Sequence, residues 1–181
     1  MTERLITFSE PSFALSKGPN GKEVPFHVVL VEPEIPQNSG NIARLCAGTG
    51  AWLHLVEPLG YKLEDRYLRR AGLDYWPGVT LSVHPSIADL EEMLPRERTW
   101  LFSKRGESVY TDVSYPTGAV LVFGCETRGL PAEFVERWKE GLVRLPTTGN
   151  VRSLNLANTV AVGSYEVVRQ QGWRGETPMP G

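Results

Sequence analysis

Two side-chain amides, a glycine and an arginine stand together between Asn38 and Arg44. They follow the apolar run Phe26–Val31 and open a helical pattern that ends at Gly50. The passage from a strand to a helix is a common place for a ligand site in α/β proteins. Amides hydrogen-bond polar ligand groups, and a guanidinium can bind a phosphate or orient a hydroxyl. We therefore expect a binding site here.

Two later segments have a similar character. Residues 123–131 form a glycine-rich junction, and residues 145–155 connect an apolar run to the last helical pattern. We expect Asn41, Glu126 and Asn155 to shape one pocket through hydrogen bonds between these loops. Glu126 can also be read as a first-turn acid of the helix that begins near Pro131, and Asn155 as an N-terminal turn residue of the last helix.

Other familiar chemistries lack their residues. The chain has neither a Gly-x-Gly-x-x-Gly segment after the first strand nor a P-loop, so these phosphate-binding frames are absent. His27, His54 and His84 are isolated in the sequence and are interpreted as structural. Two cysteines are too few for a cysteine metal site or a disulfide framework, and we expect free thiols. We predict no metal.

Composition indicates one soluble domain. A chain of 181 residues with 41% hydrophobic and 22% charged residues is long enough for one core. No apolar stretch reaches the roughly 18 residues of a membrane span, and no signal sequence is evident. We expect a cytoplasmic protein.

The net charge of −2 argues against nucleic-acid binding through bulk positive charge. Local binding to RNA remains open. Arg66, Arg69 and Arg70 share one predicted helical face, and this cluster is either a solvated surface or an RNA contact. Three more arginines lie at the candidate loops: Arg44, Arg128 and Arg152.

Apolar runs alternate with helical patterns, which predicts an α/β domain with a parallel sheet covered on both faces. The domain spans residues 26–172, between a flexible N-terminal extension (residues 1–25) and a C-terminal tail (residues 173–181). Strands are predicted at Phe26–Val31, Trp52–Val56, Val79–Val83, Thr99–Phe102, Ala119–Phe123 and Leu142–Leu145. Helices are predicted at Asn41–Thr49, Leu63–Ala71, Ser86–Leu94, Ala132–Trp138 and Ser153–Gln170.

The first helix carries an apolar stripe that can pack on the sheet, while Arg44 points away from it. Asn38 or Ser39 can accept the first free backbone N–H groups, and Gly50 suits a left-handed C-terminal cap. The stripe consists of Ile42, Leu45, Cys46 and Thr49.

The last helix is rich in poor helix formers, so we expect surrounding structure or a second subunit to clasp it. Tyr165 on its stripe is either a core tyrosine or a functional group. The predicted stripe consists of Leu154, Ala157, Ala161, Tyr165 and Val168.

Four ordered segments carry a family resemblance. Residues 32–46, 70–75, 123–131 and 152–158 resemble the SPOUT (α/β-knot) RNA methyltransferases, most closely the TrmL-type tRNA (cytidine/uridine-34)-2′-O-methyltransferases. The resemblance covers residues 26 to about 172. Residues 1–25 have no counterpart, and the loop at 147–151 is slightly longer than the family pattern.

The resemblance implies a C-terminal trefoil knot in which S-adenosylmethionine binds and leaves as S-adenosylhomocysteine. No metal is needed, because the sulfonium already activates the methyl group. The cofactor positions implied are Phe102, Gly124, Glu126, Leu145, Ser153 and Leu154. Apolar Phe102, Leu145 and Leu154 can sandwich an adenine, and glycine at 124 permits a close backbone approach.

The resemblance also implies a homodimer that methylates the ribose of the tRNA wobble nucleotide in the anticodon stem-loop. Arg44 then orients the 2′-hydroxyl, and Tyr165 or a phosphate assists loss of the proton. The implied pocket and substrate residues are Asn38, Asn41, Asn155, Arg128 and Arg152. Two alternatives stay open: methylation of another RNA or of a base, and a non-catalytic RNA-binding module.

Overall fold

The computed structural model describes residue 13 and residues 23–63 and 78–172. The predicted helix 63–71, the arginine cluster at 66–70 and the matched segment 70–75 therefore lie wholly or almost wholly outside the described residues.

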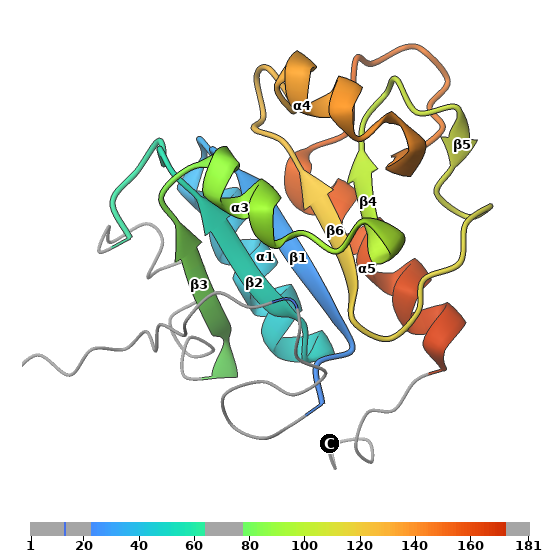
Figure 1. Ribbon diagram of the computed structural model, residues 1–181. Coiled ribbons are helices and arrows are strands. Elements are labelled where there is room, and N and C mark those ends of the chain that lie inside the picture. Colours follow the sequence, from blue (N-terminus) through green and yellow to red (C-terminus); the bar gives the residue numbers. More distant parts are fainter. Residues whose placement is uncertain (1–12, 14–22, 64–77, 173–181) are drawn as a thin grey trace, which may run out of the picture.

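Seven parallel strands form the central sheet in the order β3-β2-β1-β6-β4-β7-β5 (Figure 1). Strands β1, β2 and β6 are buried along their whole length, as is typical of a parallel sheet covered on both faces. The strands are β1 (Phe26–Val31), β2 (Trp52–Val56), β3 (Thr80–His84), β4 (Thr99–Phe102), β5 (Ser108–Val109), β6 (Ala119–Phe123) and β7 (Leu142–Arg144).

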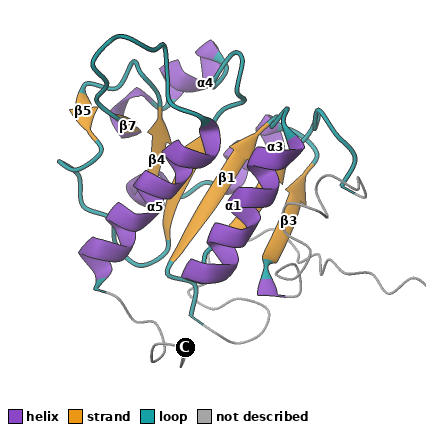
Figure 2. Ribbon diagram, turned by 180° about the vertical axis from the view of Figure 1, so that it is seen from behind, coloured by secondary structure: helices purple, strands orange, loops and turns teal. Residues whose placement is uncertain are grey.

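Two long helices cover one face of the sheet and two shorter helices cover the other (Figures 1 and 2). On the first face, α1 (Pro36–Thr49) packs against α5 (Leu156–Gln171). On the second face lie α3 (Ile87–Met93) and α4 (Ala132–Arg137). Short 3-10 turns occur at Arg96–Arg98 and Lys139–Gly141. The predicted α/β architecture is confirmed.

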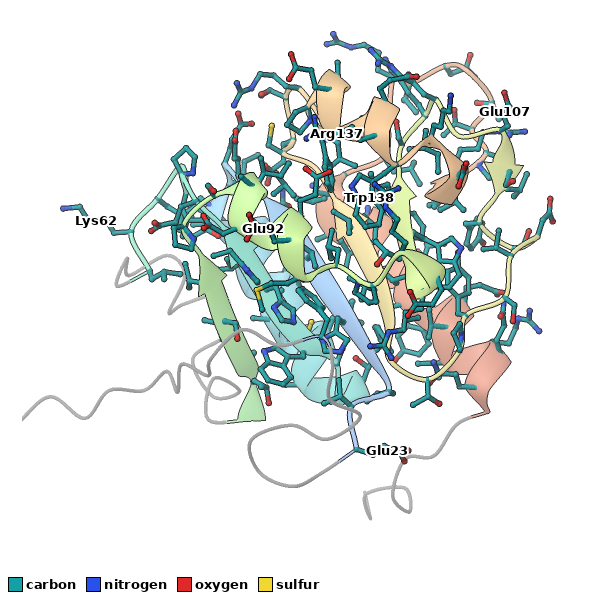
Figure 3. The ribbon with its side chains drawn as sticks, in the orientation of Figure 1. Glu23, Lys62, Glu92, Glu107, Arg137 and Trp138 are labelled. Atoms are coloured by element: carbon teal, nitrogen blue, oxygen red, sulfur yellow. The ribbon has the colours of Figure 1, made fainter. Side chains whose placement is uncertain are left out.

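Each face of the sheet has its own apolar core. Under α1 and α5, the inward side chains include Val28, Ile42 and Val160. Under α3 and α4, they include Val29 and Phe134. The opposite directions of Val28 and Val29 follow from the two-residue period of a strand. Arg137 and Trp138, labelled in Figure 3 at the end of α4, also bind the Glu91 carboxylate of α3.

Helix α1 begins five residues earlier than predicted. Pro36 occupies its first turn, where the missing N–H costs nothing, and Ile35 is the N-cap without a side-chain cap bond. The prediction that Asn38 or Ser39 caps this helix is therefore wrong, because both side chains lie inside the first turns and are buried. Gly50 ends the helix at φ 75°, as predicted.

Helix α5 also differs from its prediction. It begins at Leu156, and the Asn155 side chain caps it by accepting from the Ala157 and Asn158 N–H groups. The predicted stripe is right at Ala157 and Val168, which pack against the core, and wrong at Tyr165 and Leu154, which are 55% and 42% exposed. The residues that face the interior are Leu156, Val160, Gly163, Ser164, Glu166 and Val167.

The end of α5 is clasped by surrounding structure, as expected. Gln170 accepts from the Tyr115 N–H at 2.9 Å and donates to the Val113 carbonyl at 2.9 Å. Gln171 donates to the carbonyls of Pro25 and Pro116. These side-chain bonds compensate for the weak helix propensity of the segment.

The three histidines are isolated in the sequence but contiguous in space. Nδ1 of His27 lies 3.0 Å from Nε2 of His54, and Nδ1 of His54 lies 3.0 Å from Nε2 of His84. All three rings are buried, and Phe13 packs against them at centroid distances of 4.4 to 5.9 Å. Among the described residues, no group of three or more potential ligand side chains could hold a metal ion.

Across the described ranges we find no helix with the length and apolar character of a membrane span. Both cysteines, Cys46 and Cys125, are buried free thiols.

Candidate functional site

A cavity of about 810 Å³ opens at the carboxyl ends of the central strands. Because β1, β4, β6 and β7 are parallel, the loops that follow them meet at one edge of the sheet. Those loops line the cavity, together with the first turns of α1 and α5. Nine predicted site residues lie on its wall: Asn38, Phe102, Gly124, Glu126, Arg128, Arg152, Ser153, Leu154 and Asn155.

Asn38 joins the three loops. Its Nδ2 donates to Glu126 Oε1 at 2.8 Å, and its Oδ1 accepts from Asn155 Nδ2 at 3.0 Å. Glu126 also accepts from the backbone N–H groups of Glu34 and Ile35. Glu126 thus bonds to the residues that lead into α1 instead of acting as a first-turn acid of α4, where Glu133 has that place. Asn155 bonds across the loops and also caps α5.

Phe102 and Phe123 make an apolar wall, with ring centroids 4.5 Å apart. Gly163 of α5 lies directly behind Phe102: a Cβ added at Gly163 would lie 2.8 Å from Phe102 Cζ. The glycine therefore lets the helix approach this wall. Leu154 adds a further apolar surface that is 42% exposed.

Gly124 has a structural role within its own loop. A Cβ added there would lie 2.1 Å from the Gly129 carbonyl carbon and 2.2 Å from the Leu130 nitrogen. Glycine is therefore required for the loop to close on itself. Gly124 also lines the cavity, so its close approach to a cofactor stays a prediction.

Four predicted site residues do not line this cavity: Asn41, Arg44, Leu145 and Tyr165. Leu145 packs against the core beneath α1 and α5. Asn41, Arg44 and Tyr165 are exposed on the helices. Asn41 has no side-chain hydrogen bond within the part of the chain that the structure describes, so the bond across the loops that we expected from it is not formed.

The opening of the cavity is basic. Lys104 and Arg105, in the loop after β4, join Arg128 and Arg152 on its lining. Arg128 pairs with Glu32 at 3.1 Å, yet its side chain is 71% exposed. Lys104 and Arg105 were not predicted as site residues, although their place two and three positions after the pocket residue Phe102 was a usable signal.

Comparisons with known proteins agree with this geometry. The SpoU rRNA Methylase family matches residues 25–165. The chain belongs to this SpoU methylase family. A SpoU relative from Burkholderia cenocepacia, a tRNA (cytidine(34)-2′-O)-methyltransferase, is 50% identical over 156 residues, which are 83% of this chain and 98% of the relative. The enzyme of the same name from Saccharophagus degradans is 46% identical, again over 83% of this chain and 98% of the relative.

Solved structures share the fold of this chain. One of them is described as giving structural insights into the 2-OH methylation of C/U34 on tRNA. It matches this chain with a TM-score of 0.77 and 49% sequence identity, and the match covers 81% of this chain and 95% of that chain. The SpoU methyltransferase AviRb from Streptomyces viridochromogenes, solved with AdoMet, has a TM-score of 0.73 and 24% identity, covering 89% of this chain and 63% of that chain. At this identity the likeness shows the fold alone.

Proposed function

We propose that this protein methylates the ribose 2′-oxygen of nucleotide 34, C or U, in tRNA, with S-adenosylmethionine as the methyl donor. The observation that carries the proposal is the near full-length similarity to tRNA (cytidine(34)-2′-O)-methyltransferases at up to 50% identity, combined with a cavity built by the matched loops. We also propose a cytoplasmic location, which a tRNA substrate supports.

The cavity fits the donor chemically. Phe102 and Leu154 offer apolar surfaces for an adenine ring, and the polar wall of Asn38, Glu126 and Asn155 offers hydrogen-bonding groups beside them. Pockets for nucleotide-like ligands commonly combine these two kinds of lining. We retain Ser153 and Leu145 as donor-binding candidates, Ser153 from the wall and Leu145 from the adjoining core. When bound, the donor supplies an activated methyl group on a sulfonium.

The protein must then align the ribose hydroxyl with that methyl group and help remove one proton. The new carbon–oxygen bond forms as the carbon–sulfur bond breaks, and the hydroxyl proton passes to an acceptor. We assign alignment to Arg44, whose planar guanidinium can bind the hydroxyl and a neighbouring phosphate at once. A phosphate or Tyr165 receives or relays the proton.

Arg44 and Tyr165 do not line the cavity of their own chain, which supports a homodimer in which a second copy brings them to it. They lie on α1 and α5, which pack side by side (Figure 2). Tyr165 and Val162 leave apolar surface exposed on α5, at 55% and 38%, and Asn41 stands near Arg44 on α1. The basic opening with Lys104, Arg105 and Arg152 then faces the anticodon stem-loop.

We further infer that the C-terminal segment is threaded as a trefoil knot. Hydrogen bonds at both ends of α5 support this inference. The N-cap residue Asn155 donates to Asn38. At the other end, Gln170 donates to the Val113 carbonyl and Gln171 to the Pro116 carbonyl. An experimental structure whose traced backbone lacks the threading would contradict this inference.

The function is tested by incubating the protein with labelled S-adenosylmethionine and total tRNA, followed by mapping of the labelled nucleotide. We expect one 2′-O-methyl group at position 34. Label only in ribosomal RNA or on a base would favour another RNA methyltransferase. RNA retention without donor binding would favour a non-catalytic RNA-binding module.

A further inference from the structure

Glu34 lies outside the cavity but is bonded to its wall. This residue is in the loop between β1 and α1, and its carboxylate accepts twice from Thr127: from the Oγ1 hydroxyl at 2.8 Å and from the backbone N–H at 3.1 Å. Thr127 lines the cavity, whereas Glu34 does not. The hydrogen bond from the Thr127 hydroxyl holds the pKa of the Glu34 carboxyl below its usual value, so the acceptor is charged at neutral pH.

The bonds between the two loops are reciprocal. Glu34 accepts from the backbone N–H of Thr127, and Glu126 accepts from the backbone N–H of Glu34 at 2.9 Å. Each loop therefore offers a carboxylate to the backbone of the other. Arg128 of the same loop as Glu126 and Thr127 also forms an ion pair with Glu32, which precedes α1. Three consecutive residues of the cavity wall are thus tied to the segment before α1.

The segment that carries Glu34 is itself held from behind. The Gly60 N–H donates to the Pro33 carbonyl at 2.9 Å. A Cβ at Gly60 would lie 2.7 Å from the Glu34 Cα, so the two backbones are in close contact. Because this side is held by the loop that follows β2, Glu34 can serve as the fixed end of the connection, and residues 126–128 are the part that it holds.

We propose that Glu34 is a positioning residue for donor binding. It holds Thr127 so that the adjacent Glu126 keeps its bond to Asn38, and through Asn38 the wall stays joined to Asn155 at the start of α5. This inference rests on the proposed function, since it assigns the cavity to S-adenosylmethionine. Without Glu34, the free protein samples open forms of the loop, and ligand binding must restore the closed form at a cost in affinity.

The experiment measures S-adenosylmethionine and S-adenosylhomocysteine binding by calorimetry, and single-turnover methylation at saturating donor. For Glu34→Ala we expect about tenfold weaker binding of both ligands, because two bonds to a charged acceptor are lost. The rate at saturation should stay within about twofold, since bound donor restores the wall. Thr127→Val should weaken binding less, as the backbone bond remains, and Thr127→Ser should bind like the unchanged protein.

Glu92→Ala is the matched control. Glu92 is an exposed glutamate on α3, on the side of the sheet away from α1 and α5 (Figure 3), and its removal should leave donor binding unchanged. In a double-mutant cycle, Thr127→Val should weaken donor binding little further in a protein that already carries Glu34→Ala. Thermal melting of each variant separates lost affinity from lost folding, and Thr127→Val tests the inference if Glu34→Ala does not fold.

Unchanged donor affinity in folded Glu34→Ala and Thr127→Val, with an unmodified protein that binds donor, would overturn the positioning role alone. A fall in the saturated rate with unchanged affinity would also overturn it. If the unmodified protein binds no donor, the proposed function fails instead, so the two failures are distinguishable.

Discussion

Single atoms decide how close α5 can come to the pocket wall. Gly163 has Phe102 Cζ 2.8 Å from the position of its missing Cβ, whereas Gly48 in α1 has no atom within 4 Å of that position. These two positions therefore have different reasons to be glycine. Of the two, Gly163 is the one that serves the site.

We predict opposite effects for the same substitution at these glycines. Gly48→Ala should raise the free energy of unfolding by about 0.5–1 kcal/mol, because alanine has the better helix propensity. Gly163→Ala should lower it by about 1–3 kcal/mol through overpacking, and should weaken donor binding by displacing Phe102. Urea denaturation and calorimetry provide the measurements. If Gly48→Ala and Gly163→Ala stabilise the protein equally and donor affinity is retained, the role of Gly163 is contradicted.

Arg44 is predicted to act through the shape of its side chain as well as its charge. Arg44→Lys keeps the positive charge but loses the planar fork, so we expect single-turnover methylation to fall by about 10- to 100-fold with little change in donor affinity. An unchanged rate in this variant would exclude the proposed alignment of the hydroxyl.

At the scale of elements, β1, β2 and β3 bring three histidines into one buried row. Burial, with the nearby Arg98 charge as a smaller cause, lowers the pKa of His27 to about 3. Burial also lowers the pKa of His84 to about 4 and holds that of His54 well below its usual value. All three rings are therefore neutral in the folded protein at neutral pH.

Stability should consequently fall as the pH drops below about 6.5. In that range the histidines bind protons in the unfolded chain but stay neutral in the folded protein. The free energy of unfolding therefore falls by up to about 1.4 kcal/mol per pH unit for each histidine. The loss continues toward pH 4, where the depressed folded pKa values are approached. Glu34, Glu91 and Glu166 have lowered pKa values and contribute their own loss only below about pH 4.5.

Urea denaturation between pH 4.5 and 7.5 checks this prediction, because the carboxylates contribute little in that window. His84→Gln should reduce the pH slope by about a third, whatever its effect on stability at pH 7.5. A free energy of unfolding that is flat across the window would show that the row is not kept neutral by burial.

At the scale of the whole molecule, the proposed active site needs two copies of the chain. Glu126 and Asn155 line the cavity of one copy, while Arg44 is proposed to come from the other. Residues that act together at one site, yet belong to different chains, can complement one another in mixed dimers.

We predict such complementation. Arg44→Ala and Glu126→Ala should each be inactive alone, whereas subunits mixed at random should regain roughly a quarter of full activity, since half of the dimers are mixed and each contains one intact site. Methylation of tRNA by separately tagged, coexpressed variants measures this. The control pair, Glu126→Ala with Asn155→Ala, should regain none, because both residues line the same cavity. Equal failure of both pairs would place Arg44 in its own chain's site.

The sequence by itself determined the family and most of the elements, although it did not predict the short strand β5. Strands β1, β2, β4 and β6 were predicted with their observed bounds, because each is a short apolar run between turn residues and its pattern is local. The four ordered motifs pointed to the methyltransferase family, which the comparisons confirm. The candidate loops were recognised because parallel strands place their carboxyl ends at one edge.

Only the tertiary structure decided which side chains meet. Asn38 bonds with a partner 117 residues away in the chain, and the histidines come together through strands 27 and 30 residues apart. The buried face of α5 was mispredicted in part, at Leu154 and Tyr165, because packing against α1 and the sheet, and not the helix's own pattern, selects it. Strand order and register set these contacts, and neither is encoded in the spacing of residues along one element.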